Sequence, residues 1–320
     1  MEQQKPLNLI IDCDPGVDDA VALALAAAFR DRLRLLAITT VAGNQTLERV
    51  TANALNLSAL LGLDVPVASG CAEPLVREKA PAADIHGPTG LGDCRLPESG
   101  RRPASDNAVL FLQNTILSLP PEEGVTLVPI GPLTNIALLL KAFPEVKPRI
   151  SQICLMGGGI NGGNRTAAAE FNIWADPEAA HMVFTAGIPL TMCGLDATMQ
   201  GGLTRPQVEG LRTGGGRVSA YFGEMLDFYF RSLNYRNRDV VAIHDATTLL
   251  YLLYPDLFAT AQLPVTVDCG EGLTRGMTLA DRRSFLEDGG PRVTVLTDVK
   301  DPQRYQEILL DAMARLDQGA

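Results

Sequence analysis

Short, continuous runs of apolar residues alternate with longer helical patterns, and this alternation constrains the fold more than any other feature. The run LNLIID at 7–12 is apolar throughout most of its length, which is typical of a strand buried on both faces. The Ala- and Leu-rich segment VDDAVALALAAAFRD follows, with acids at its start, where the helix dipole favours them. Strands separated by helices predict a parallel sheet with helices on both faces. Further strands are expected at 33–41, 65–69, 125–130, 151–157 and 189–195, and further helices at 46–62, 107–119, 134–143 and 176–186.

The rest of the chain continues this pattern. We expect a helix at 218–233, strands within PVTVDCG, GMTLADRR and RVTVLTDV, and a last helix at 301–316. The Gly- and Pro-rich segment 85–102 has no period and is predicted to be a long loop, which in compact domains is commonly functional. No repeat, low-complexity tract or linker divides the chain. The sequence therefore predicts one α/β domain over residues 1–320, with a mainly parallel central sheet flanked by helices.

Polar residues and glycines gather where the predicted strands end. Parallel α/β sheets bind ligands beyond the carboxyl ends of their strands, so these residues are candidates for a site. They are Asp12, Asp14, Asn44, Gly131, Gly157, Gly158, Gly159 and Asp196.

The charge of the chain indicates which partners are unfavourable, and its cysteines indicate a compartment. The 320 residues include 27 Lys and Arg against 37 Asp and Glu, a formal charge of −10. A field of that sign repels phosphate backbones and anionic lipid, so nucleic acid and membranes are poor partners. The polar N-terminus shows no secretory signal. Six scattered cysteines without a CxxC pair indicate free, buried thiols, so we expect a cytoplasmic protein.

Four carboxylates lie within eight residues around a Pro-Gly turn, at Asp12, Asp14, Asp18 and Asp19. Like charges this close raise one another's pKa unless a cation neutralises them. Oxygen ligands favour a hard ion, Ca²⁺ or Mg²⁺. An acidic helix cap is the alternative, but two acids would suffice for a cap, so the pattern favours a metal site.

A second candidate is the pair His244 and Asp245, which precedes the helical segment ATTLLYLLY. A lone histidine is more often structural than catalytic, and Asp245 could simply cap the helix. If the chain brings this end back to the first strand, Asp245 could instead supply a ligand oxygen. His244 could then supply a proton, since its unperturbed pKa is near 6.5.

The segment 161–180, NGGNRTAAAEFNIWADPEAA, is the third candidate. Asn164, Glu170 and Asn172 can pair donors and acceptors with the hydroxyls of a polyhydroxylated ligand. Asp176 and Pro177 are expected to cap a helix. The preceding run MGGG lacks the Lys of a phosphate-binding loop and the spacing of a dinucleotide fold, which excludes those interpretations.

Together these segments carry a family resemblance. The runs IIDCDPGVDDA, TTVAGNQT, DIHGPTGLG, VPIGPLTNIALLL, LMGGG, AEFNIWADPEAA and IHDA, with GLTRGMTLADRR near the C-terminus, resemble the nucleoside hydrolases. More narrowly, they resemble the inosine-uridine-preferring ribonucleoside hydrolases. The resemblance covers essentially the whole chain. It implies a calcium-dependent enzyme of nucleoside salvage that forms a homodimer or homotetramer.

The resemblance also implies a role for each matching residue. Ca²⁺ would be held by Asp14, Asp19, Asp245 and the backbone carbonyl of Ile130, where many relatives have Thr. Asp14 would also be the general base on a calcium-bound water, and His244 the leaving-group acid. Ribose contacts match Asp18, Asn44, Asn164, Glu170 and Asn172, with Met156 a pocket residue and His86 a histidine on the base side.

The implied reaction is hydrolysis of the N-glycosidic bond to ribose and a free nucleobase. Such bonds break through an oxocarbenium-like cation, which a cluster of carboxylates would stabilise. Tyr229 and Leu233 lie one helical turn apart on a helix expected near the base, and Tyr235 is a further stacking candidate. One aromatic and one aliphatic residue leave the choice between purine and pyrimidine open.

Two other functions fit part of the pattern. A haloacid-dehalogenase-like phosphohydrolase also has Asp-x-Asp after its first strand, but it would need Thr or Val where Gly16 stands. A calcium-dependent nucleoside- or sugar-binding protein without catalysis would share the acidic cluster. The presence of both Asp14 and His244 argues against that loss of catalysis.

Overall fold

An eight-stranded sheet forms the centre of the computed structural model, which describes residues 5–79, 87–232, 235–283 and 292–319. The strand order is β3-β2-β1-β4-β5-β6-β12-β9, and every neighbouring pair is parallel except β12 and β9. The strands are β1 (Leu7–Cys13), β2 (Leu33–Thr40), β3 (Val67–Ser69), β4 (Val125–Pro129), β5 (Ile150–Met156), β6 (Leu190–Cys193), β9 (Phe258–Leu263) and β12 (Val293–Val299). The predicted α/β domain with a mainly parallel sheet is confirmed.

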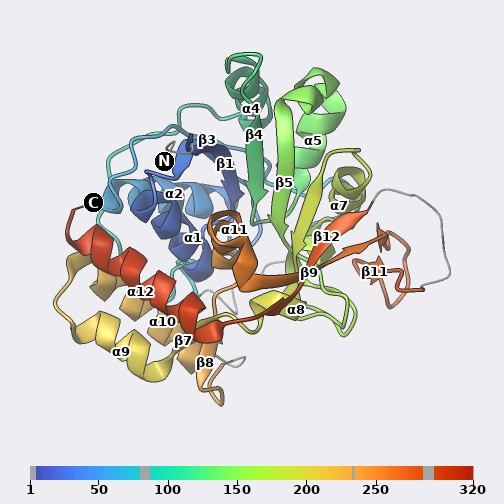
Figure 1. The fold of residues 1–320 in the computed structure, drawn as a ribbon. Coiled ribbons are helices and arrows are strands. Elements are labelled where there is room, and N and C mark those ends of the chain that lie inside the picture. The colour runs from blue at the N-terminus through green and yellow to red at the C-terminus, as the bar shows by residue number, and fades with distance from the viewer. Residues whose placement is uncertain (1–4, 80–86, 233–234, 284–291, 320) are drawn as a thin grey trace.

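Helices cover both faces of this sheet (Figure 1). On one face the sheet packs against α1 (Val17–Ala28), α2 (Leu47–Leu60) and α11 (Ala246–Leu253), and α10 (Arg217–Arg231) and α12 (Pro302–Asp317) pack against α1. The other face packs against α4 (Ala108–Leu117), α5 (Thr134–Ala142) and α7 (Pro177–Phe184). Side chains of β1 alternate between the two apolar cores, with Leu9 and Ile11 in one and Ile10 in the other. This explains why the strand is continuously apolar in sequence.

Helix α1 is buried along its whole length. All of its 12 residues are buried, including Asp18 and Asp19 in its first turn. Its alanines let neighbouring helices approach closely, whereas the two buried acids have no hydrophobic reason to be there. Their burial indicates a functional role for the amino-terminal end of α1.

The smaller elements lie outside the main sheet. They are the helices α6 (Phe171–Ala175), α8 (Leu195–Thr198) and α9 (Arg205–Thr213), the 3-10 helices at Pro144–Arg149 and Pro255–Leu257, and the strand pairs β7 (Gly202–Thr204) with β8 (Val240–Ala242) and β10 (Val265–Val267) with β11 (Thr278–Ala280). The β10–β11 hairpin projects from one side of the molecule (Figure 1).

Most predicted elements agree with the structure, with local differences. The sequence does not predict the antiparallel strand β9, because it lies at the sheet edge, where its residues are largely exposed or half-buried. Thr46 is the residue before α2 and makes no side-chain capping bond. Gly62 follows the helix with φ +63°, a conformation that favours glycine, and so helps to end it.

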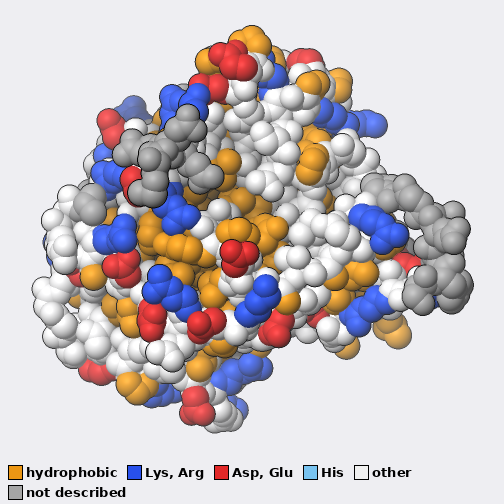
Figure 2. Space-filling model, viewed as in Figure 1, with side chains coloured by type: hydrophobic (Ala, Val, Ile, Leu, Met, Phe, Trp, Pro, Cys, Tyr) orange, Lys and Arg blue, Asp and Glu red, His pale blue; other side chains and the backbone are white. Residues whose placement is uncertain are grey.

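The surface carries charges of both signs. On the face shown in Figure 2, Lys and Arg side chains are interspersed with Asp and Glu side chains. No helix in the described part of the chain is long and apolar enough to cross a membrane.

Candidate active site

A cavity of about 610 Å³ lies at the carboxyl ends of the central strands. After β1, the chain adds β2 and β3 on one side of that strand and then β4 on its other side. The cavity lies near this change of direction. Such a reversal of strand order leaves a crevice between the flanking loops. Eleven residues predicted from the sequence line the cavity: Asp18, Asn44, Ile130, Met156, Asn164, Glu170, Asn172, Tyr229, Tyr235, His244 and Asp245.

The predicted ligand Asp14 is almost completely buried beside this cavity. Its Oδ2 accepts a hydrogen bond of 2.6 Å from the backbone N–H of Asn44, whereas Oδ1 is buried without a partner. A Cβ at Gly43 would lie 2.1 Å from Oδ2, and one at Gly131 would lie 2.6 Å from Oδ1. The two glycines therefore leave just enough space for the carboxylate, and its unpartnered oxygen fits a cation.

The neighbouring Asp19 closes the turn between β1 and α1. Its Oδ1 accepts from the N–H of Asp14 at 3.1 Å, and its Oδ2 accepts from the N–H of Gly16 at 2.8 Å and from Nδ2 of Asn44 at 3.2 Å. Both oxygens thus hold the Pro-Gly turn in shape. Asp19 links the loops after β1 and β2 in one network.

Three carboxylates meet at this end of α1. One oxygen from each of Asp18, Asp19 and Asp245 lies within 4.8 Å of the others, all three residues being buried. Burial raises the pKa of Asp19 to about 7, and burial and the neighbouring carboxylates raise the pKa of Asp14 and Asp245 well above their usual values. Asp245 makes no side-chain capping bond at the start of α11, so a helix cap does not account for it. This cluster could hold a metal ion, because a cation would offset the repulsion.

The carbonyl of Ile130 completes the set of predicted oxygen ligands. It accepts a hydrogen bond of 2.9 Å from Nδ2 of Asn172, which also lies 3.1 Å from the carbonyl oxygen of Met156. A carbonyl oxygen has two lone pairs, so this bond leaves one available for another partner. Asn172 therefore connects the loop after β4 to the loop after β5.

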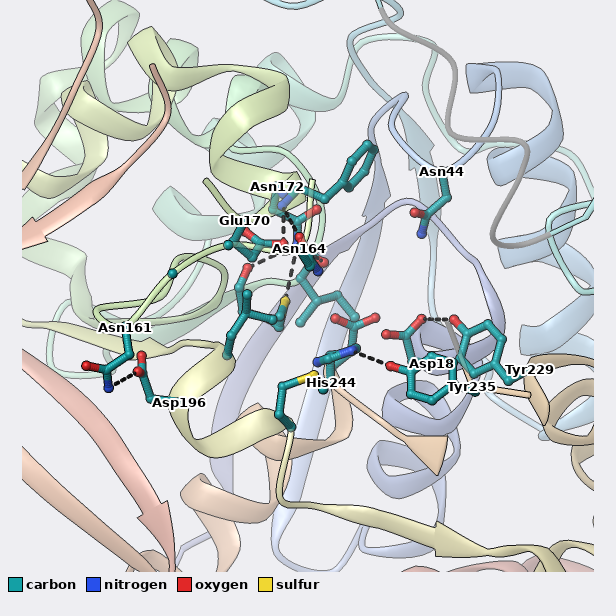
Figure 3. Close-up of a pocket in the computed structure, with 18 of the residues that line it drawn as sticks. Asp18, Asn44, Asn161, Asn164, Glu170, Asn172, Asp196, Tyr229, Tyr235 and His244 are labelled. Atoms are coloured by element: carbon teal, nitrogen blue, oxygen red, sulfur yellow. Dashed lines mark hydrogen bonds between the residues drawn. The ribbon is translucent and has the colours of Figure 1, made fainter. Parts of the chain in front are cut away.

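Glu170 and Asn164 lie with Asn172 on the opposite part of the cavity wall from Tyr229 (Figure 3). The Glu170 carboxylate accepts from the backbone N–H groups of Gly158, Asn172 and Ile173, at 2.9, 2.9 and 3.2 Å. Burial still raises its pKa to about 7, because desolvation outweighs these donors. Oδ1 of Asn164 accepts from the N–H of Phe171 at 2.9 Å. This group offers amide and carboxyl atoms to a hydroxylated ligand.

His244 lies between two hydroxyl groups. Its Nδ1 is 2.8 Å from Oγ1 of Thr198. Its Nε2 is 3.0 Å from the hydroxyl of Tyr235 (Figure 3). Burial lowers the pKa of the imidazole below its usual value. Both ring nitrogens thus have defined partners, which orients the ring toward the cavity that it lines.

Tyr229 contacts the acidic cluster. Its hydroxyl donates to Oδ1 of Asp18 at 2.8 Å, and its ring stacks on that of Tyr235 with centroids 5.6 Å apart and planes inclined by 17°. The predicted base-side residues His86 and Leu233 lie outside the described residues.

Several cavity residues were not singled out from the sequence as site residues. They are Asn161, Gly162, Gly163, Phe171, Leu195, Asp196, Met199 and Arg238, of which only Asp196 was noted, as a residue at a strand end. Asp196 accepts from the N–H of Ile160 and from Nδ2 of Asn161, at 2.8 and 2.7 Å, and so holds the loop after β5. Arg238 and Thr198 carry no periodic or motif signal; only the fold places them beside the site.

The arrangement has a definite chemical capacity. The acidic cluster can bind a cation and stabilise positive charge on a ligand. The amides and Glu170 can recognise hydroxyls, and the imidazole of His244 can exchange a proton within the same cavity. A hydroxylated substrate that develops positive charge as one of its bonds breaks fits all three features.

Comparisons with known proteins agree with this geometry. The model of the inosine-uridine preferring nucleoside hydrolase family matches residues 9–307. A pyrimidine-specific ribonucleoside hydrolase, RihA, of Salmonella paratyphi C is 42% identical over 310 residues, covering 96% of this chain and 98% of that protein. RihA of Photobacterium profundum is 43% identical over 311 residues, with the same coverage.

Solved structures show the same relationship. A purine-preferring ribonucleoside hydrolase from Gardnerella vaginalis matches with a TM-score of 0.89 and 33% identity, covering 98% of this chain and all of that one. A plant nucleoside hydrolase matches with a TM-score of 0.89 and 32% identity over 97% and 99% of the two chains. The chain therefore belongs to the inosine-uridine preferring nucleoside hydrolase family and is a nucleoside N-glycosidase.

Proposed function

We propose that this enzyme hydrolyses pyrimidine ribonucleosides, such as uridine, to ribose and the free base. The observation that carries the proposal is one cavity lined both by carboxylates and amides suited to ribose and by His244, a group able to protonate a departing base. The pyrimidine preference rests on the 42–43% identity to enzymes named as pyrimidine-specific, against 33% to one named as purine-preferring.

The donor set supports Ca²⁺ as the cation. Asp14, Asp19, Asp245 and the carbonyl of Ile130 supply only oxygen, which is the ligand set that calcium prefers. A cation would partner the Oδ1 of Asp14 and would offset the repulsion among the carboxylates, whose pKa values burial and their neighbours raise. When bound, Ca²⁺ would supply charge that orients the ribose diol and acidifies a water molecule.

The chain's own residues then divide the reaction between them. Asp18, Asn44, Asn164, Glu170 and Asn172 would bind the ribose hydroxyls, and Met156 would be a further residue of the pocket. Asp14 would accept the proton of the attacking water. The carboxylates would stabilise the positive charge that develops on the ribosyl group as the N-glycosidic bond breaks.

His244 is proposed as the acid that protonates the departing base. Its lowered pKa makes the protonated imidazole a stronger acid than a histidine in water. The hydroxyl of Thr198 on Nδ1 orients the ring, so that Nε2 is the nitrogen on the side of Tyr235.

Incubation of the purified enzyme with uridine, cytidine and inosine tests the proposal. We expect release of ribose and base with calcium present, with kcat/KM larger for the pyrimidines. Hydrolysis of p-nitrophenyl phosphate instead would favour the phosphohydrolase alternative. Binding of uridine without any product would favour a binding protein without catalysis.

The family also implies an assembly and a compartment. We infer a homodimer or homotetramer, which sedimentation would report as a species of twice or four times 34.2 kDa. A single 34.2 kDa species at micromolar concentration would contradict this. All six cysteines are free in the structure, which supports the reducing cytoplasm as the compartment.

A further inference from the structure

The contact between Tyr229 and Asp18 joins two elements that are far apart in the chain. Tyr229 lies on α10 and is 2% exposed, and Asp18 lies in the first turn of α1 and is 6% exposed. The 2.8 Å hydrogen bond between them is buried and charge-assisted, and it joins residues that are 211 positions apart in sequence. Bonds of this kind are about twice as strong as those between neutral groups.

Asp18 needs such a restraint because its neighbours repel it. One of its oxygens lies within 4.8 Å of oxygens of Asp19 and Asp245, which are proposed metal ligands. A carboxylate in that position can also turn toward the cation. A donor fixed on Oδ1 holds the carboxylate in one orientation and keeps it available to the substrate.

Tyr229 is itself held in place. One face of its ring is covered by Tyr235, and burial raises the pKa of its hydroxyl well above the usual value, so the group remains a donor. The two stacked rings present their hydroxyls to different partners, Tyr229 to Asp18 and Tyr235 to Nε2 of His244 (Figure 3). The pair therefore connects the ribose side of the cavity to the leaving-group side.

We propose that Tyr229 is a positioning residue for ribose recognition, which acts through Asp18 rather than by stacking on the base. This inference rests on the proposed function, in which Asp18 binds the ribose. It assigns Tyr229 to the ribose side of the reaction and Tyr235 to the leaving-group side. The two residues differ in hydroxyl partner but share one stack, so each serves as the matched control for the other.

The test is a double-mutant cycle of Tyr229→Phe with Asp18→Ala. Tyr229→Phe retains the ring, and Asp18→Ala removes a repelling charge from the cluster, so both variants are expected to fold. Tyr229→Phe should lower kcat/KM for uridine by ~10- to 100-fold, the worth of a hydrogen bond to a charged group. It should lower that for p-nitrophenyl riboside by the same factor, and it should cause no further loss in the Asp18→Ala background.

Tyr235→Phe provides the control. Its hydroxyl faces His244, so its loss should slow uridine and spare p-nitrophenyl riboside, whose leaving group needs no proton. In the double variant, the fold-loss in kcat/KM for uridine from Tyr235→Phe should multiply the fold-loss from Asp18→Ala, because the two residues act at different parts of the substrate. Thermal melting and calcium content of each variant show that fold and metal site are intact.

Binding of D-ribose, measured by calorimetry, separates this inference from the proposed function. Its affinity should fall in Tyr229→Phe, should fall at least as far in Asp18→Ala, and should fall no further in the double variant than in Asp18→Ala. If the wild-type enzyme binds ribose in this way but hydrolyses no nucleoside, the proposed function fails and the positioning role stands. A full additional loss from Tyr229→Phe in the Asp18→Ala background, or a loss confined to uridine, would overturn the positioning role.

Discussion

At the scale of single residues, the site is shaped by carboxylates that are buried without enough partners. Asp14 has one unpartnered oxygen, and Asp18, Asp19 and Asp245 converge within 4.8 Å. Burying unpaired charge costs several kcal/mol per ion, so a chain keeps such a cluster only where function requires it. Variants of Asp19 and of His244 separate the role of the cluster from that of the histidine.

Asp19→Ala should remove both the bound calcium and the activity, because it deletes a ligand and loosens the turn that Asp19 holds. Elemental analysis of the purified variant measures the metal. Asp196→Asn is the control, since that carboxylate accepts hydrogen bonds from Ile160 and Asn161 in the loop after β5, and the variant should leave the calcium content unchanged. Stoichiometric calcium in Asp19→Ala would mean that the ligands are other residues.

His244→Ala should slow uridine hydrolysis by about 10²- to 10⁴-fold, the usual contribution of general acid catalysis. It should barely slow p-nitrophenyl riboside, whose leaving group departs as a stable anion. Asp14→Asn should slow both substrates, because activation of water serves either one. Steady-state kinetics on the two substrates makes the comparison, and equal losses in His244→Ala would show that the histidine only positions its neighbours.

At the scale of elements, the loops after β1, β2 and β4 form one unit around Asp14. The loop after β2 supplies the N–H of Asn44, which donates to Asp14. The loop after β4 supplies Gly131, whose Cα has room only for a hydrogen on the side that faces Asp14. The loop after β5 joins this unit through Asn172, which donates to the carbonyl of Ile130. The parallel sheet supplies the common edge from which all four loops start.

Gly131→Ala should therefore disturb the site although the residue touches no substrate. Its Cβ would lie 2.6 Å from Oδ1 of Asp14 and 3.0 Å from a Val41 methyl, so the carboxylate must move. A shift of about 1 Å in a catalytic group can cost about 10²-fold in rate, and we expect a loss of that order in kcat/KM.

Gly210→Ala is the control for that variant. Gly210 lies within α9 with nothing near its Cβ position, so alanine should stabilise the fold by roughly 0.5–1 kcal/mol and leave activity unchanged. Thermal melting measures the stability of both variants, and kinetics show whether only Gly131→Ala loses activity. Wild-type activity in Gly131→Ala would show that Asp14 tolerates displacement.

At the scale of the whole molecule, the acidic cluster couples stability to pH and to metal. Burial raises the pKa of Asp19 from 3.8 to about 7 in the folded, metal-free protein, and raises that of Asp14 and Asp245 as well. Between about pH 4 and about pH 7, the unfolded and folded pKa values of Asp19, the folded state therefore binds more protons than the unfolded state. By linkage, the stability of the metal-free protein falls as the pH rises through this interval.

Melting curves should show this dependence directly. In the presence of a chelator, Tm should decrease between pH 5 and pH 8. With calcium, Tm should be highest near neutral pH, because the metal binds the deprotonated carboxylates. Asp19→Asn should flatten the decrease in chelator. A Tm in chelator that is constant or rises over this range would contradict a cluster that is protonated when metal-free.

Sequence and tertiary structure determined different parts of this protein. Apolar period, glycines and strand-end acids are local signals, so they predicted the parallel sheet, the acidic turn at Asp14 and Asp19, and part of the cavity wall. The family resemblance added Ile130, Met156 and Tyr229 to that wall. Contacts between distant segments have no local signal. The pairing of Tyr229 with Asp18, of Thr198 and Tyr235 with His244, and the place of Arg238 in the wall depend on how α1, α8 and α10 pack. The edge strand β9 also lacks a local signal, because it forms by pairing with β12, which is distant in the sequence.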